Sequence, residues 1–156
     1  MRFGLIRTSH ILIAAGAMAA FAGGAAAQSV TYENTVKKIV ADRCLVCHGT
    51  GSPSLAEFLK DQESWKKKMK GPRMDSYANL AILVNGTDAG AFMRRLDDGK
   101  NTKDGKPGNM YAYLGGNDAE RAQRLDTMKK WVGNWSLKRR KELSEAELRT
   151  ITAPEK

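Results

Sequence analysis

The sequence contains few of the residues that usually build metal and redox sites. Among 156 residues there are two cysteines, Cys44 and Cys47, and two histidines, His10 and His48. A structural zinc site uses four Cys or His ligands, and only three remain once His10 leaves with the leader described below. A thioredoxin-like dithiol lies between a strand and a helix, but the segment before Cys44 has a helical pattern and nothing after it alternates like a strand. Both kinds of site are therefore disfavoured.

Long apolar segments are also scarce, apart from one near the start of the chain. Two arginines, Arg2 and Arg7, precede an apolar run at residues 11–21 and small residues at 25–27, which is the pattern of a secretory signal peptide. The run is shorter than the about 20 residues that span a bilayer, so we expect cleavage and no stable membrane anchor. The predicted organisation is a signal peptide at 1–27 and one domain at 28–156, of which 134–156 is a C-terminal extension.

Acidic residues are fewer than basic ones, 17 against 26. Removal of the leader with its two arginines leaves a net charge of +7. A basic surface attracts acidic partners, and export to the periplasm argues against nucleic acid. We therefore expect redox protein partners with acidic docking surfaces.

The two cysteines and the remaining histidine form one motif. Residues 44–48 read Cys-Leu-Val-Cys-His, the C-x-x-C-H pattern of covalent haem attachment. Two thiols separated by two residues on a helical turn can each add to one vinyl group of the porphyrin. The next residue then lies under the iron, where an imidazole can bind it as the proximal ligand. The motif predicts haem c bound by Cys44 and Cys47, with His48 as the proximal iron ligand.

The rest of the chain has helical periodicity, which predicts an all-α fold. Ser54 and Ser144 each begin a capping box with Glu three residues later, and glycines or prolines follow most of the apolar patterns. The long loop at 86–109 is broken by a helical turn, and a loop of this length suggests a function such as wrapping a cofactor. The expected helices cover 32–44, 54–69, 75 or 76 to 84, the turn at 91–96, 117 or 118 to 132, and a short one from 144 through 148.

The second iron ligand cannot be a histidine, because His48 is the only one left in the mature chain. Methionine is the natural alternative, since its thioether is soft and neutral and favours reduced iron. Met69 and Met128 lie on helical apolar stripes, where packing in the core is the default role. Met74, Met93 and Met110 remain as candidates.

Several segments resemble the class I, mitochondrial-type, cytochrome c family. Lys37-Lys38-Ile39 before Arg43 and the C-x-x-C-H motif is similar to that family's N-terminal helix. Pro107-Gly108-x-Met110, followed by Tyr111, Tyr113 and Gly115, is similar to its methionine loop, and residues 125–132 are similar to its C-terminal helix. The matches cover both ends of the haem domain and leave 52–106 poorly accounted for.

The resemblance implies a cytochrome c-like fold of about four to five helices around one covalently bound haem c and its iron. It implies Met110 as the distal ligand, with Met93 as the rival, because many bacterial relatives place the ligand soon after a helix ending in glycine. It also implies a proline carbonyl that accepts the free N–H of His48, from Pro72 or, as second choice, Pro53.

Three functions fit these residues. The first is a one-electron carrier that is not an enzyme. The second is a haem enzyme or gas sensor with an open sixth coordination site, which would need an acid–base group from Glu, Arg or Tyr because no second histidine is present. The third is a dithiol oxidoreductase, which the sequence context disfavours.

Overall fold

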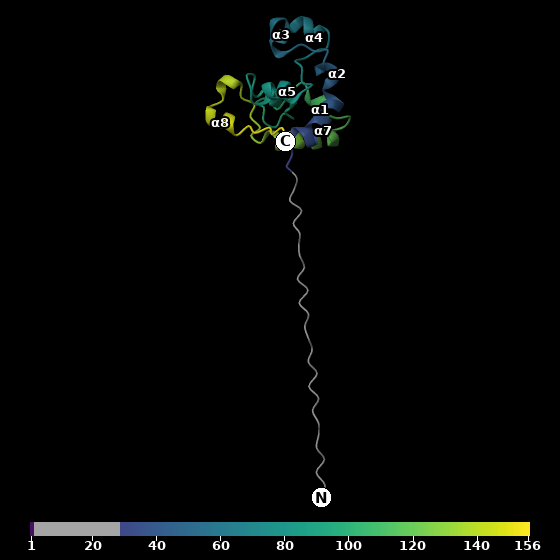
Figure 1. Ribbon diagram of the computed structural model, residues 1–156, viewed down its shortest axis with the longest axis vertical. Helices are drawn as coiled ribbons and strands as arrows, with labels where there is room; N and C mark the ends of the chain where they lie inside the picture. The colour runs from purple at the N-terminus through teal and green to yellow at the C-terminus, as the bar shows by residue number, and fades with distance from the viewer. Residues whose placement is uncertain (2–28) are drawn as a thin grey trace.

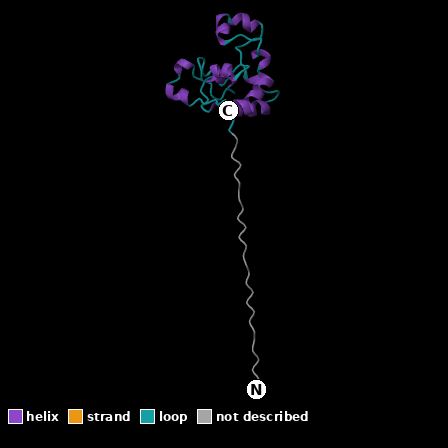
Figure 2. Cartoon of the chain, in the orientation of Figure 1, coloured by secondary structure: helices purple, strands orange, loops and turns teal. Residues whose placement is uncertain are grey.

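The computed structural model describes Met1 and residues 29–156, and within these residues every named element is helical (Figures 1 and 2). The predicted all-α class is confirmed. The predicted signal peptide, apart from Met1, and its cleavage site lie outside the described residues. The elements are η1 (Tyr32–Val36), α1 (Lys37–Arg43), α2 (Leu45–His48), α3 (Leu55–Lys60), α4 (Gln62–Lys67), α5 (Tyr77–Val84), α6 (Ala91–Leu96), η2 (Tyr111–Leu114), α7 (Asp118–Val132), η3 (Arg140–Glu142) and α8 (Glu145–Arg149).

The N-terminal segment runs from η1 through α1 to α2, as the apolar spacing predicts. Thr31 caps it reciprocally with Asn34: the Thr31 hydroxyl accepts from the Asn34 N–H at 3.2 Å, and Asn34 Oδ1 accepts from the Thr31 N–H at 2.9 Å. Its buried face carries Val36 and Val40, which are at most 2% exposed. The turn that carries both cysteines therefore follows directly from a helix that is anchored in the core.

The predicted helix over 54–69 begins at the Ser54 capping box but divides into α3 and α4 at Asp61, whose φ of −148° and ψ of 69° are not helical. The Asp61 side chain then caps α4 by accepting from the Ser64 N–H at 3.0 Å. Such breaks explain why the chain has more helical segments than expected.

The prediction that Met69 packs in the core is wrong. The amides of Met69 and Lys70 bond the carbonyls of Lys66 and Trp65, both at 2.9 Å, which is the hydrogen-bond pattern of a Schellman cap. Met69 occupies the left-handed position of this cap with φ 55°, and its side chain is 72% exposed. The apolar stripe therefore ends with α4, before it reaches Met69.

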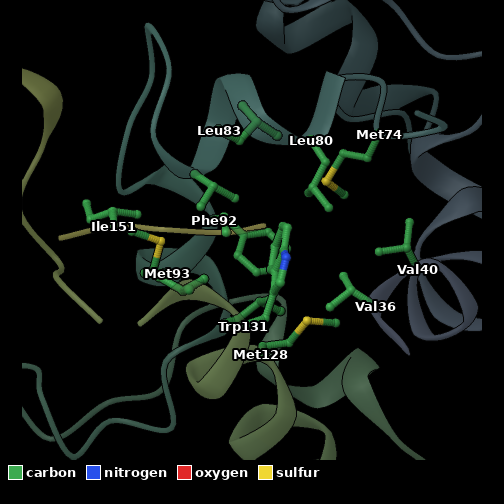
Figure 3. Packing of buried hydrophobic residues seen from close by; sticks show 14 of the residues in the cluster. Val36, Val40, Met74, Leu80, Leu83, Phe92, Met93, Met128, Trp131 and Ile151 are labelled. Carbon is green, nitrogen blue, oxygen red and sulfur yellow. The ribbon is translucent and has the colours of Figure 1, made fainter. Parts of the chain in front are cut away.

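The centre of the core forms where α6 and α7 meet (Figure 3). The rings of Phe92 and Trp131 pack edge to face with centroids 6.1 Å apart, a favourable aromatic geometry. Met128 is fully buried beside them, as predicted.

Two ion pairs join α7 to the end of α1. Arg43 binds Glu120 at 2.8 Å, and Arg124 binds Asp42 at 2.7 Å.

The C-terminal extension at 134–156 packs on the same core. Figure 1 draws α8 on the side of α5 away from α1 and α7, and the chain then returns to the N-terminal helix. The Pro154 carbonyl accepts from the Tyr32 N–H at 2.8 Å and from Trp131 Nε1 at 2.9 Å, while Ile151 and Ala153 are buried. None of the helices that the structure describes is long and apolar enough to cross a membrane.

Candidate haem site

His48 lies at the end of α2, and one of its ring nitrogens faces a backbone carbonyl. Nδ1 is 2.6 Å from the Pro72 oxygen. A carbonyl only accepts, so Nδ1 carries the proton and donates, and Nε2 is left with the lone pair that binds a metal. The predicted Pro72 partner is confirmed, whereas the Pro53 carbonyl accepts from the Arg73 N–H instead. Burial lowers the pKa of His48, which favours the neutral form that ligates metals.

Gly71 brings the Pro72 carbonyl to the ring. The Gly71 N–H donates to the Cys47 carbonyl and the Met74 N–H donates to the His48 carbonyl, at 2.9 and 2.8 Å. This pairs residues 71–74 with the attachment turn. A Cβ atom added at Gly71 would lie 2.1 Å from Cε1 of His48, closer than any side chain tolerates, so the position requires glycine.

Cys44 and Cys47 are half-buried free thiols on one helical turn. The amides of Cys47 and His48 both bond the Cys44 carbonyl, at 3.1 and 2.9 Å. Burial raises the pKa of Cys44 to about 11, so its thiol is neutral. The turn presents two sulfurs and one imidazole within five residues, as the motif predicts.

The candidate methionines have different surroundings. Met110 is half-buried and directly precedes η2, which packs against α1 and α6. Met93 is fully buried in α6, and Figure 3 draws it on the far side of Phe92 and Trp131 from Val40. The Cys44 N–H bonds the Val40 carbonyl at 2.8 Å, so the attachment turn begins beside Val40, on the other side of the two rings from Met93.

Met74 is also buried, at 7% exposed. It belongs to the segment paired with His48 through the backbone, and therefore to the histidine side of the site.

The donor set fits a haem better than a bare metal ion. Across the described residues no group of three or more His, Cys, Asp or Glu side chains is placed to hold a metal. Two thiols, one oriented imidazole and available thioethers instead match the needs of a covalently attached haem. In such a site Cys44 and Cys47 would hold the porphyrin, and His48 with one methionine would hold its iron.

The helical fold and this attachment turn define a monohaem cytochrome c. The chain belongs to the PccH cytochrome c family, which it matches over residues 31–155, and it therefore carries one covalently bound haem c with its iron. It is similar to the monoheme cytochrome PccH from Geobacter sulfurreducens, a solved structure with 43% identity and a TM-score of 0.76 that covers 81% of this chain and 99% of that one. No curated protein sequence matches the chain.

The sequence signals do not single out Gly71 as a neighbour of His48, or Asp97 and Trp135 as a bonded pair. The Gly71-Pro72 pair is a typical helix stop, and such a pair gives no sign of contact with a histidine. Asp97 and Trp135 stood in a polar loop and in the extension, yet they bond each other at 2.9 Å. Only the Asp-Asp-Gly sequence at 97–99, typical of a side-chain-capped turn, offered a signal for Asp97.

Proposed function

We propose that this cytochrome is a periplasmic one-electron carrier and not an enzyme, with Cys44 and Cys47 as the thioether anchors and with His48 and Met110 as the iron ligands. The haem supplies the one-electron chemistry, and the protein holds it with both axial positions filled. The observation that carries the proposal is the His48 Nδ1 contact with Pro72 at 2.6 Å, because it turns Nε2 outward as a ligand and leaves the second ligand to another segment.

The packing favours Met110 as that second ligand. Its N–H bonds the Arg95 carbonyl at 2.9 Å, which fixes the loop end beside α6, and η2 carries the next residues against α1. The side chain is half-buried, so it has room to turn toward a cofactor held at the end of α1.

Met93 is a weaker candidate because its side chain already fills the core. It is fully buried, and its removal from that place would leave a cavity that costs about 2–5 kcal/mol. Its position on the far side of Phe92 and Trp131 from Val40 (Figure 3) also separates it from the attachment turn.

A near-infrared spectrum of the ferric holoprotein tests the ligand. We expect a methionine–iron charge-transfer band that is lost in Met110→Leu and kept in Met93→Leu, the matched control. Survival of the band in Met110→Leu would contradict the assignment. A high-spin ferric spectrum in the native protein would instead support a haem enzyme or gas sensor with an open sixth position.

Export is proposed from the leader at 1–27, whose arginines, apolar run and small-residue end fit a signal peptide. Fractionation of the producing cell should recover the haem-loaded chain in the periplasm with Gln28 at its N-terminus. Recovery in the membrane with the leader attached would contradict both the cleavage and the absence of an anchor.

Acidic redox partners are proposed from the basic character of the surface next to the attachment turn. Residues 66–70 contain four lysines, and Lys70 Nζ bonds the Val46 carbonyl at 3.0 Å. Val46 and Met69 are 78% and 72% exposed, so apolar side chains lie among the positive charges, as in the centre and rim of many interfaces.

Charge reversal tests this surface. We expect Lys67→Glu with Lys68→Glu to slow electron exchange with an acidic redox protein about tenfold or more at low salt, and the difference to shrink as salt screens the charges. Lys156→Glu, at the C-terminus, is the control. Equal rates for all three proteins would contradict docking at this surface.

A further inference from the structure

Asp97 is a fully buried carboxylate outside the attachment motif. It follows α6 directly and begins the loop that ends at Met110. Its oxygens accept four hydrogen bonds, all from neutral donors: Oδ1 from the N–H groups of Gly99 and Asn101 at 2.8 and 3.3 Å, and Oδ2 from Asn101 Nδ2 and Trp135 Nε1 at 2.8 and 2.9 Å. A buried charge is tolerated only when its hydrogen-bonding capacity is met in this way.

The same residue also holds the far end of the loop. The Asp97 carbonyl accepts from the Gly108 N–H at 2.8 Å, and two residues earlier the Arg95 carbonyl accepts from the Met110 N–H at 2.9 Å. A Cβ atom on Gly108 would lie 2.3 Å from the Arg95 oxygen, so the backbone at Gly108 lies in close contact with the backbone at the end of α6. The carboxylate thus fixes the start of the loop, and the adjoining backbone fixes its end.

Trp135 anchors this arrangement to the rest of the protein. Its indole comes from the C-terminal extension, and Lys129 Nζ on α7 lies 5.7 Å from the ring centroid. Lys129 also lies 3.7 Å from Asp98. The loop is therefore tied to both α7 and the extension through one buried carboxylate and its neighbour.

We propose that Asp97 is a positioning residue for Met110: with Trp135 it holds the 97–110 loop in the conformation that presents the methionine. The inference rests on the proposed role of Met110. Without the Asp97 hydrogen bonds the loop opens more often, and an external ligand competes with the methionine more successfully, because local opening reduces the population of the ligated state.

The test is imidazole binding to the ferric holoprotein, followed through loss of the methionine–iron band. Asp97→Asn is nearly isosteric, but it replaces one carboxylate oxygen with an NH2 group. Because both oxygens of Asp97 accept from N–H groups, the NH2 group faces N–H donors whichever of the two places it takes. We expect it to bind imidazole about tenfold or more tightly than the native protein, as the loss of hydrogen bonds to a charged group implies. Asp104→Asn, the same change at an exposed position of the same loop, is the matched control and keeps the native affinity.

A second variant covers the case in which Asp97→Asn does not accumulate. Trp135→Phe removes one of the four donors and should tighten imidazole binding by a smaller factor. Native affinity in Asp97→Asn, or in Trp135→Phe where only that variant folds, overturns the inference.

The two proposals fail in different ways. If the native band is absent, or if it survives in Met110→Leu, the ligand assignment is wrong and this inference falls with it. If the band depends on Met110 while Asp97→Asn binds imidazole like the native protein, only the positioning role is wrong.

Discussion

His48 and Met110 stand at the ends of two segments that differ in how they are held. His48 lies within the attachment turn, one residue after Cys47, and its ring is oriented by a Gly71–Pro72 segment that pairs with the same turn. Met110 ends a loop that leaves α6 at Asp97. The Met110 N–H bonds the Arg95 carbonyl of α6, and Trp135 of the extension bonds the Asp97 carboxylate at the start of the loop.

The difference separates what a motif encodes from what the whole fold encodes. On the histidine side, spacing along five residues places the reacting groups, and one glycine gives the ring room. On the methionine side we propose that a carboxylate, an indole and two backbone contacts, brought together from residues 95 to 135, position the ligand. Substitutions on the histidine side should therefore be harmful when they add atoms that clash with the ring. Substitutions on the methionine side should be harmful when they remove hydrogen bonds.

The largest effect is expected from Gly71→Ala. The new methyl group would lie 2.1 Å from His48 Cε1, so either the ring or the Pro72 carbonyl must move, and overpacking of this kind costs about 3 kcal/mol. We expect a lower free energy of unfolding in denaturant and a changed ferric spectrum, because the imidazole loses its orientation.

Gly51→Ala is the control for this change. A Cβ atom there meets nothing within 4 Å, and exposed substitutions usually stay within about 0.5 kcal/mol. Equal stability of the two alanine variants would show that the His48 ring can move to admit a methyl group. The histidine side would then not be sensitive to steric clash, as we expect it to be.

A smaller and pH-dependent effect is expected from Asp97→Asn on global stability. Burial opposes ionisation, but the hydrogen bonds from Asn101, Trp135 and Gly99 outweigh it and hold the pKa of Asp97 below its usual value. The stabilisation is therefore complete above the unfolded pKa of about 3.9 and is lost as pH falls through the lower folded value. Near neutral pH the variant should unfold about 2 kcal/mol more easily than the native protein.

The decisive measurement is the stability difference between native protein and variant as a function of pH. It should begin to narrow below about pH 4, where the carboxyl group of the unfolded chain takes up a proton, and should close as the pH falls through the lower pKa of the folded protein. A difference that stays constant or widens in acid would mean that the charge of Asp97 is not what stabilises the loop.

The sequence predicted the parts of this fold that depend on neighbouring residues. Local signals correctly place the capping boxes at Ser54 and Ser144, the helix between the caps Asn117 and Gly133, and the short helix α6. The helical turn at 44–48 also forms where the motif predicts it, because its signal lies in five consecutive positions.

The contacts between distant segments were not predictable in the same way. The bond from Trp135 to Asp97 spans 38 residues, and that from Tyr77 to Ala153 spans 76. No periodicity reports such pairs, since they depend on where the chain turns in space. The prediction that Met69 is buried was wrong for a related reason, because a helical apolar stripe does not show where the helix ends.

The smallest expected effect concerns that helix end and has the opposite sign. Met69 is held at φ 55° with its side chain exposed, a backbone conformation that glycine adopts without cost and other residues do not. Met69→Gly should therefore raise the free energy of unfolding by about 0.5–1 kcal/mol, whereas Met128→Gly, in the buried middle of α7, should lower it by several times as much. If Met69→Gly were destabilising, the methionine at 69 would have to make contacts that its exposure does not show, and the histidine side would depend on more than its turn and its glycine.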